Sequence, residues 1–198
     1  MIPVILQTEP SDFNIEVRKK GHDWLQSQGI ALGSAPPDPS KLPAYWQHSN
    51  KGLWDKYGGV CAYLAIFFEW STGASSTDHF VAKSRSAGDA YEWNNFRLSC
   101  LGANRNKNKF DDILDPIGLA IGTFHLNLLT GKIYSNASLG TQVKQQAEKT
   151  IERLKLDSKD NRDMRVRHYG EYLRHRDKDF FQEKSPFVWY EAKRQGLL

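Results

Sequence analysis

The segment that decides the fold spans residues 76–109 and reads STDHFVAKSRSAGDAYEWNNFRLSCLGANRNKNK. Its strand-like run, Phe96–Cys100, follows an Asn pair and precedes a polar, basic segment, residues 104–110, that we predict to be a short helix. Near the start of the segment, Asp78 and His79 are adjacent. A strand through both residues would send their side chains to opposite faces, whereas a kink or a strand end would let them converge.

The side chains of this segment suit one kind of chemistry. The carboxylate of Asp78 can hold a hard divalent cation, and the neutral imidazole of His79 can take a proton from water near neutral pH. Asn104 offers a neutral oxygen ligand. Residues 97–109 contain no acid and four cations, namely Arg97, Arg105, Lys107 and Lys109. A metal, a base and nearby cations together favour phosphodiester hydrolysis.

Each feature also has a purely structural interpretation. An Asp-His pair is commonly a turn or a surface hydrogen bond, and an Asn-Asn pair is typical turn chemistry. A short basic run is commonly the solvated face of a helix. The order and the spacing of the features favour function more than any one of them does.

That order resembles the HNH nuclease motif, in which two strands and one helix clasp a cation (the ββα-metal fold). The resemblance implies that His79 is the general base, that Asp78 and Asn104 are metal ligands, and that Asn95 braces the hairpin loop. Asn94 competes for the brace, but the pattern W-x-N-F-x-L-x-C aligns Asn95 with the family's asparagine. The cofactor that the resemblance implies is Mg²⁺, Mn²⁺ or another divalent cation, and the substrate is DNA.

The resemblance extends to one subgroup. Residues 79–84, HFVAKS, are similar to the H-F-x-P-K-S signature of HNH proteins found with retrons and with Septu-type phage defence systems. This implies a role in antiviral defence and a partner such as an SMC-like ATPase or another defence-system subunit. Lys83 is expected to contact a phosphate from the hairpin loop, together with Arg97, Arg105, Lys107 and Lys109.

The two cysteines depart from the family pattern. Many relatives carry two C-x-x-C pairs that hold a structural zinc ion, whereas here Leu64 and Ala103 replace the second cysteine after Cys61 and Cys100. We therefore expect no structural zinc. Apolar packing, including the aromatic pair at 67–68, is expected to replace it.

The composition of the whole chain agrees with a folded protein that can bind a polyanion. Its 198 residues are 39% hydrophobic, and 27 Lys and Arg against 23 Asp and Glu give a net charge of +4. The longest apolar run covers nine residues, 60–68, which is too short to cross a bilayer, and the N-terminus lacks the pattern of a secretion signal. We predict a cytoplasmic protein without membrane contact.

The remaining pattern predicts an α+β protein with a ββα-metal (HNH) core and helical extensions at both ends. Helices are expected over 11–29 and 43–57, joined by a Pro-rich connector, and again from 141. Strand-like runs cover 61–68, 96–100, 122–129 and 132–134, and residues 129–132 read as a hairpin turn. We expect one domain, 1–198, divided into a helical wrap (1–57), the core with a hairpin (58–135) and a helical extension (136–198).

Three histidines follow the motif along the chain. His125 is predicted to be a satisfied strand histidine, although a phosphate contact is the alternative. His168 and His175 lie in a mixed-charge segment, 162–178, that is predicted to be a solvated helix face rather than a DNA-binding arm.

The sequence thus predicts a metal-dependent endonuclease that cleaves DNA. One alternative is a nucleic-acid-binding module without turnover. Another is an interaction subunit that is active only in a complex with an ATPase partner, which the modest net charge favours.

Overall fold

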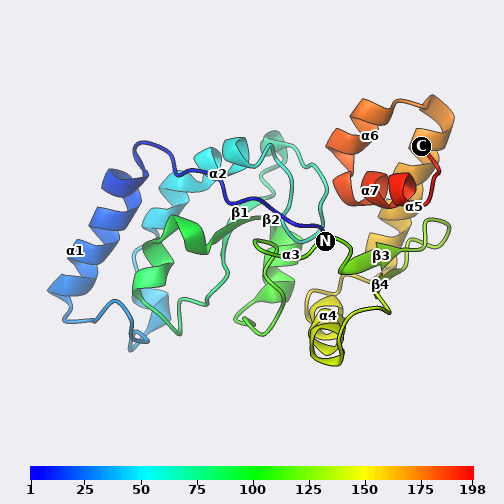
Figure 1. The fold of residues 1–198 in the computed structure, drawn as a ribbon. Helices are drawn as coiled ribbons and strands as arrows, with labels where there is room; N and C mark the ends of the chain where they lie inside the picture. Colours follow the sequence, from blue (N-terminus) through cyan, green and yellow to red (C-terminus); the bar gives the residue numbers. More distant parts are fainter. The chain divides into compact units, whose positions relative to one another are not determined.

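The computed structural model describes residues 1–198, which fold into two compact units (Figure 1). The first unit contains Met1–Ile5, Val60–Phe68 and Asp112–Leu198, and the second contains Leu6–Gly59 and Glu69–Asp111. Seven α-helices and two two-stranded antiparallel sheets confirm the α+β class. The units do not follow the expected three segments, because residues 112–135 group with the C-terminal helices. The single-domain expectation stays a prediction.

The second unit begins with the helices that the sequence predicts. A π-helix, η1 (Asn14–Lys19), continues into α1 (Lys20–Ser27), and a 3-10 helix, η3 (Tyr45–Ser49), continues into α2 (Asn50–Lys56). Short 3-10 turns, η2 (Pro39–Lys41) and η4 (Trp70–Thr72), lie in the connections. Gly21 must be glycine, because a Cβ atom there would lie 2.1 Å from the ring of Tyr91.

The sheet of the second unit is a long-looped hairpin followed directly by a helix. Strands β1 (Ser75–His79) and β2 (Phe96–Cys100) are antiparallel, with Ser75 opposite Cys100 and His79 opposite Phe96. The loop between them contains two 3-10 turns, η5 (Gly88–Tyr91) and η6 (Trp93–Asn95). Helix α3 (Leu101–Lys107) starts immediately after β2, three residues earlier than the predicted 104–110.

The hairpin rests on an aromatic core. Phe96 packs edge-on against Phe13 at 5.7 Å between ring centroids, and Phe13 meets Trp93 at 5.3 Å. Phe13 and Phe96 are fully buried. The N-terminal helix and the hairpin therefore share one core, which holds the ends of both strands in place.

The first unit combines a short hairpin with four helices. Strands β3 (Phe124–Leu126) and β4 (Ile133–Ser135) are antiparallel, which confirms the predicted hairpin, and its turn contains Gly131 at φ +67°. The helices are α4 (Thr141–Arg153), α5 (Lys159–His175), α6 (Lys178–Lys184) and α7 (Pro186–Arg194). None of the helices in either unit has the length and apolar character that crossing a bilayer requires.

The strand expected over residues 61–68 is wrong. The structure has only an isolated bridge between Val60 and Phe67, around a turn in which the Ala65 amide donates to the Cys61 carbonyl. Ala65 adopts a left-handed φ of +50°, which a strand excludes. The run is apolar because its residues are buried in a turn, and burial alone does not distinguish a turn from a strand.

Candidate functional site

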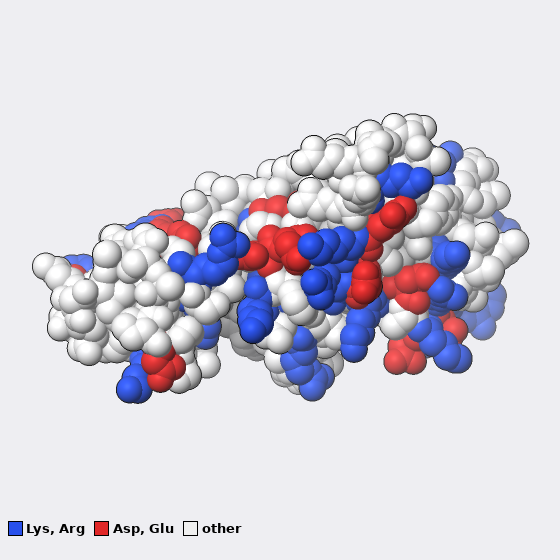
Figure 2. Space-filling model, turned by 90° about the horizontal axis from the view of Figure 1, so that it is seen from below, with Lys and Arg blue, Asp and Glu red and all other residues white.

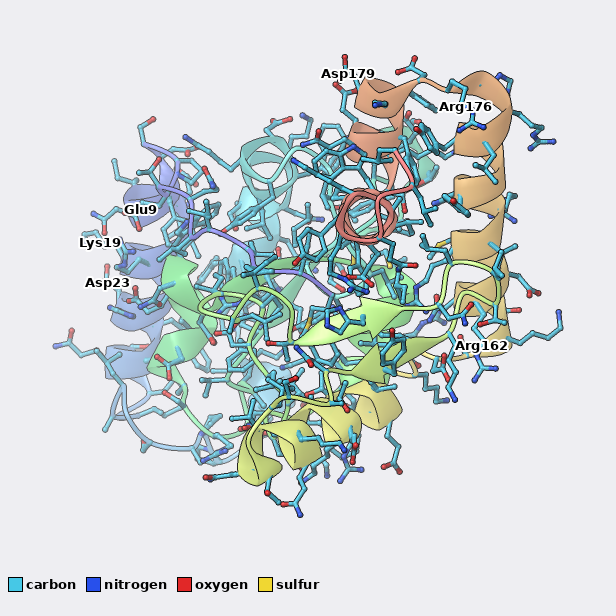
Figure 3. The ribbon with its side chains drawn as sticks, turned by 45° about the vertical axis from the view of Figure 1, so that its right-hand side comes forward. Glu9, Lys19, Asp23, Arg162, Arg176 and Asp179 are labelled. Atoms are coloured by element: carbon cyan, nitrogen blue, oxygen red, sulfur yellow. The ribbon has the colours of Figure 1, made fainter.

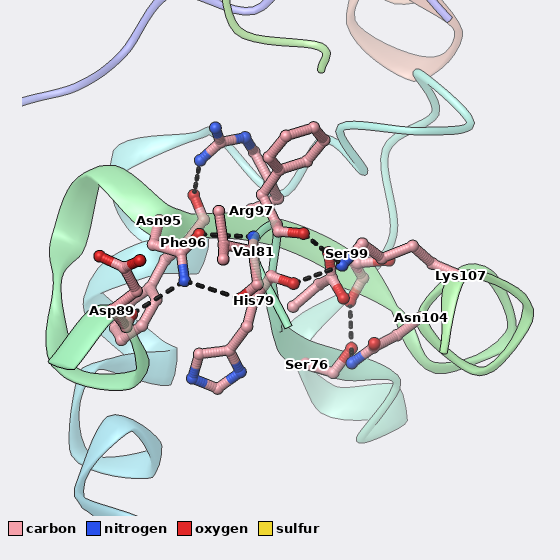
Figure 4. Close-up of polar contacts among 12 residues, drawn as sticks. Ser76, His79, Val81, Asp89, Asn95, Phe96, Arg97, Ser99, Asn104 and Lys107 are labelled. Atoms are coloured by element: carbon pink, nitrogen blue, oxygen red, sulfur yellow. Dashed lines mark hydrogen bonds and ion pairs between the residues drawn. The ribbon is translucent and has the colours of Figure 1, made fainter. Parts of the chain in front are cut away.

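A cleft of about 760 Å³ in the second unit brings most of the predicted site residues together. The end of β1, the start of the following loop, helix α3 and Trp46 line it. Six predicted residues face it, namely Asp78, His79, Lys83, Asn104, Arg105 and Lys109. Three do not: Asn95, Arg97 and Lys107. Figure 4 shows the polar contacts that hold this region.

The end of a strand explains how two adjacent side chains reach one cleft. Within β1, Asp78 lies opposite Arg97 and His79 opposite Phe96. Strand β1 ends at His79, so the alternation of faces ends there as well. Asp78 is 2% exposed and His79 is 8% exposed, yet both line the cleft.

The ring of His79 is held in one tautomer. Its Nε2 lies 3.0 Å from the carbonyl oxygen of Ala90. Because a carbonyl oxygen only accepts hydrogen bonds, Nε2 carries the proton and Nδ1 keeps a lone pair. The rings of Trp46 and Phe96 meet the imidazole edge-on at 4.9 and 5.2 Å.

The pKa of His79 is lowered to about 3, chiefly by burial, although its hydrogen bond to Ala90 opposes the shift. The charges of Lys83 and Lys107 lower it further. The imidazole is therefore neutral at pH 7, as a proton acceptor must be, but a base of this strength is weak. An anion in the cleft would raise this pKa and strengthen the base.

Lys107 is an internal residue, which corrects the expectation that it contacts DNA. Its side chain is 0% exposed, and its Nζ donates to the carbonyl oxygens of His79 and Phe80, the latter at 2.8 Å (Figure 4). The same ammonium lies 3.6 Å from Asp78 Oδ2. Burial lowers the pKa of Lys107, and the Asp78 carboxylate opposes that shift. Helix α3 thus pins the end of β1 with one buried cation.

Asn95 closes the loop between β1 and β2. Its side-chain amide donates to the carbonyl oxygens of Val81 and Asp89 at 3.0 and 2.8 Å, and its Oδ1 accepts from the Val81 amide at 2.7 Å (Figure 4). The side chain of Asn94 is exposed instead. This is the geometry of a brace, and Asn95 does not line the cleft.

Asn104 reaches the cleft from the middle of α3. Its Nδ2 donates to the hydroxyl of Ser76 at 3.2 Å, which ties the helix to β1 (Figure 4). Because the nitrogen is engaged, the amide oxygen is the atom that remains for a ligand. The start of α3 at residue 101 places Asn104 one turn into the helix rather than at its first position.

The remaining basic residues lie either at the rim of the cleft or in the interior of the protein. Arg105 and Lys109 are exposed, and the ammonium of half-buried Lys83 lies 4.3 Å from the centroid of the Trp46 ring. Arg97 is 5% exposed and donates to the carbonyl oxygens of Asn94 and Phe96, so its expected phosphate contact does not fit its position. On the face shown in Figure 2, Lys and Arg lie among Asp and Glu rather than in an uninterrupted basic stripe.

Trp46 is the cleft residue that sequence reasoning missed. Trp46 lies outside the 76–109 motif, and the spacing of the tryptophans along the chain does not indicate a stacking platform. Trp46 comes from η3, 33 positions before His79, and meets it only through the fold. Its aromatic face against Lys83 holds that ammonium at the cleft.

The three histidines that follow the motif along the chain lie in the first unit. Nδ1 of His125, on β3, lies 3.1 Å from Glu191 Oε1, which is the paired strand histidine that the sequence predicts. The segment around His168 forms α5 as a helix, but His168 is only 7% exposed, so the prediction of a solvated face is wrong at this residue. Neither unit contains three His, Cys, Asp or Glu side chains grouped as a metal site.

Comparison with known proteins does not assign the chain to a family. No protein-family model matches the chain, and no curated protein sequence matches it. The motif and the geometry of the cleft are therefore the basis for interpreting its function.

Proposed function

We propose that the protein is a metal-dependent HNH endonuclease that hydrolyses DNA phosphodiester bonds at this cleft. The observation that carries the proposal is the meeting of Asp78, His79 and Asn104 in one cleft. They come from the end of one strand and from the helix that follows its antiparallel partner. This order of elements matches what the resemblance to the HNH motif implies.

The donors at the cleft fit a hard divalent cation such as Mg²⁺ or Mn²⁺. Asp78 supplies a carboxylate and Asn104 an amide oxygen, and oxygen ligands are what these ions prefer. When bound, the ion would supply electrostatic stabilisation of charge on the phosphate and on the leaving oxygen. Two protein ligands and the ammonium of Lys107 at 3.6 Å from Asp78 predict weak binding in the absence of DNA.

His79 has the protonation state that a general base needs. Its Nε2–H donates a hydrogen bond to the carbonyl oxygen of Ala90, which fixes the orientation of the ring. Its unprotonated Nδ1 can then accept a proton from an attacking water. A substrate phosphate would bring negative charge to the cleft and raise the basicity of the ring. Lys83, Arg105 and Lys109 would hold the flanking phosphates.

The resemblance to retron and Septu-type proteins extends the proposal to anti-phage defence in the cytoplasm. A partner such as an SMC-like ATPase would then supply the additional DNA affinity that a net charge of +4 does not.

Plasmid cleavage tests the activity. The purified chain is incubated with supercoiled plasmid and Mg²⁺ or Mn²⁺, alone and with any subunit encoded beside it. His79→Ala is expected to lower the rate about 10²–10⁴-fold, as loss of a general base does. His48→Ala, a change at an exposed histidine outside the cleft, should cleave like wild type. Equal cleavage by both variants would refute the role of His79.

The pairing of Asp78 with Lys107 favours one rival, a nucleic-acid-binding module without turnover, because the ammonium competes with a metal. Mn²⁺ binding, followed by electron paramagnetic resonance, separates the two functions. The nuclease predicts binding that Asn104→Ala weakens, whereas the rival predicts DNA binding with no Mn²⁺ bound by either protein.

A further inference from the structure

Lys83 has no acidic partner, although its side chain is half-buried. Its ammonium makes no ion pair or hydrogen bond, and burial lowers the pKa of Lys83 without a carboxylate that opposes the shift. By contrast, Lys19 on the outer surface of α1 pairs with Asp23 at 2.7 Å (Figure 3). A cation that is withdrawn from water without a counter-ion is stabilised when an anion binds beside it.

The charge of the cleft also favours an anion. Three cations, Lys83, Arg105 and Lys109, line the cleft together with one carboxylate, that of Asp78. This carboxylate already lies 3.6 Å from the buried ammonium of Lys107, so it does not neutralise the other three cations. A phosphate of the nucleic acid in the proposed function is the anion that these cations would meet.

One indole ring joins Lys83 to the candidate base. The ammonium of Lys83 lies 4.3 Å from the centroid of the Trp46 ring, and the imidazole of His79 meets the same indole at 4.9 Å between centroids and 90° between planes. The ring of Tyr91 packs against this indole as well, at 5.9 Å between centroids. An aromatic face attracts an ammonium, and the attraction grows where water is excluded. The position of the ammonium relative to the imidazole therefore depends on Trp46.

We propose that Trp46 is a positioning residue, which holds the ammonium of Lys83 where it binds the phosphate that faces His79. This inference rests on the proposed function in one respect, namely that a phosphate of a nucleic acid enters the cleft. Lys83 would bind the phosphate nearest to the base, and the exposed Arg105 and Lys109 would bind phosphates farther along the strand. A purely structural Trp46 would support the walls of the cleft without acting through Lys83.

DNA binding without metal tests this coupling in the full chain. A fluorescein-labelled DNA duplex is titrated with protein in EDTA at low salt, so that fluorescence anisotropy reports binding without cleavage. Lys83→Met should weaken binding about fivefold and reduce the slope of log affinity against log salt by about 0.9, because one phosphate contact is lost. Trp46→Leu, which removes the aromatic face, should weaken binding about threefold. In the Lys83→Met background Trp46→Leu should have no further effect, because Trp46 acts through Lys83.

Two further variants control for charge and for structure. Lys51→Met removes an ammonium that also lies near a tryptophan ring, 5.0 Å from the centroid of Trp54, but outside the cleft, and it should bind DNA like wild type. Trp46→Phe keeps an aromatic face and should recover most of the affinity lost in Trp46→Leu. Lys83→Met leaves the aromatic core unchanged, so its DNA affinity decides the matter even where Trp46→Leu does not fold.

Several results would overturn the inference. Losses that multiply in the double variant, or Trp46→Phe that binds as weakly as Trp46→Leu, would show that Trp46 acts independently of Lys83. DNA affinity that Lys83→Met leaves unchanged, or wild type that binds no DNA in EDTA, would show that Lys83 holds no phosphate.

Cleavage of the same duplex in Mn²⁺ separates this inference from the proposed function. Coupled binding without cleavage by wild type would contradict the nuclease and leave the coupling of Trp46 to Lys83 intact. Cleavage that depends on His79, together with losses that multiply, would support the nuclease and contradict the coupling.

Discussion

Two buried histidines, one in each unit, differ in what surrounds them. His79 and His168 are 8% and 7% exposed, and burial lowers the pKa of both. The ring of His79 donates to Ala90, beside a lysine that is bonded to two carbonyl oxygens. The ring of His168 has a buried nitrogen with no partner. A satisfied network fixes its groups in place, whereas a buried polar group without a partner costs stability.

Among the variants that test this comparison, a change at Lys107 is expected to have the largest effect on stability. Lys107→Met removes the ammonium that lies beside buried Asp78 and that donates to two carbonyl oxygens. We expect a loss of about 3–5 kcal/mol in the free energy of unfolding, measured by urea denaturation, because a buried carboxylate loses its ammonium. Lys19→Met breaks an exposed pair with Asp23 and should cost about 0.5 kcal/mol or less. A small, equal loss in both variants would show that the buried network adds no stability.

Asn95 tests the same network at the loop. Asn95→Ala leaves the Val81 amide and two carbonyl oxygens without this partner, and we expect a loss of about 2–4 kcal/mol. Asn94→Ala changes an exposed neighbour and should cost about 0.5 kcal/mol or less. The two variants differ by one position, so thermal denaturation of both decides which asparagine is the brace. A larger loss at Asn94 would reverse the assignment.

The pH dependence of the free energy of unfolding tests the comparison at His168. Its pKa is about 4 in the folded protein and about 6.5 in the unfolded chain, so the unfolded chain binds more protons between these values. The free energy of unfolding should therefore fall as the pH drops from 6.5 towards 4, by about 2 kcal/mol from this residue. Burial is the main cause of the lowered pKa; the charges of Lys184 and Arg167 lower it further, and the charge of Glu171 opposes the shift.

Replacement of that ring isolates its contribution. His168→Gln should flatten the fall over this pH range, while the acid dependence that comes from His79 and the carboxylates stays in both proteins. Urea denaturation at several pH values measures the difference. Parallel curves for wild type and variant would show that His168 titrates normally.

The local sequence pattern predicted the helices and strands better than it predicted the surroundings of their side chains. Strand β2 and the β3–β4 hairpin follow from strand-like runs and turn residues, which act over a few positions. The strand predicted over residues 61–68 was wrong, because an apolar turn and a buried strand have the same composition. The helix at α3 was expected, but its first turn, 101–103, contains a glycine and carries no capping signal.

The candidate site was predicted in part, for a physical reason. Asp78, His79 and Asn104 belong to one motif, so their spacing carries information about the cleft. Lys107 was assigned to the surface with its neighbours Arg105 and Lys109, because a basic run gives no sign of which residue turns inward. Its partners are backbone atoms 27 and 28 positions earlier, and no side-chain pattern encodes backbone atoms.

The burial of Lys107 has a consequence for ionic strength. Mobile salt screens charges in water but not an ammonium enclosed by carbonyl oxygens. If DNA enters the cleft, the decrease of affinity with added salt should count only the exposed cations, chiefly Arg105 and Lys109 with half-buried Lys83. The interior charge would act equally in dilute and in concentrated salt, as a fixed part of the protein's own field.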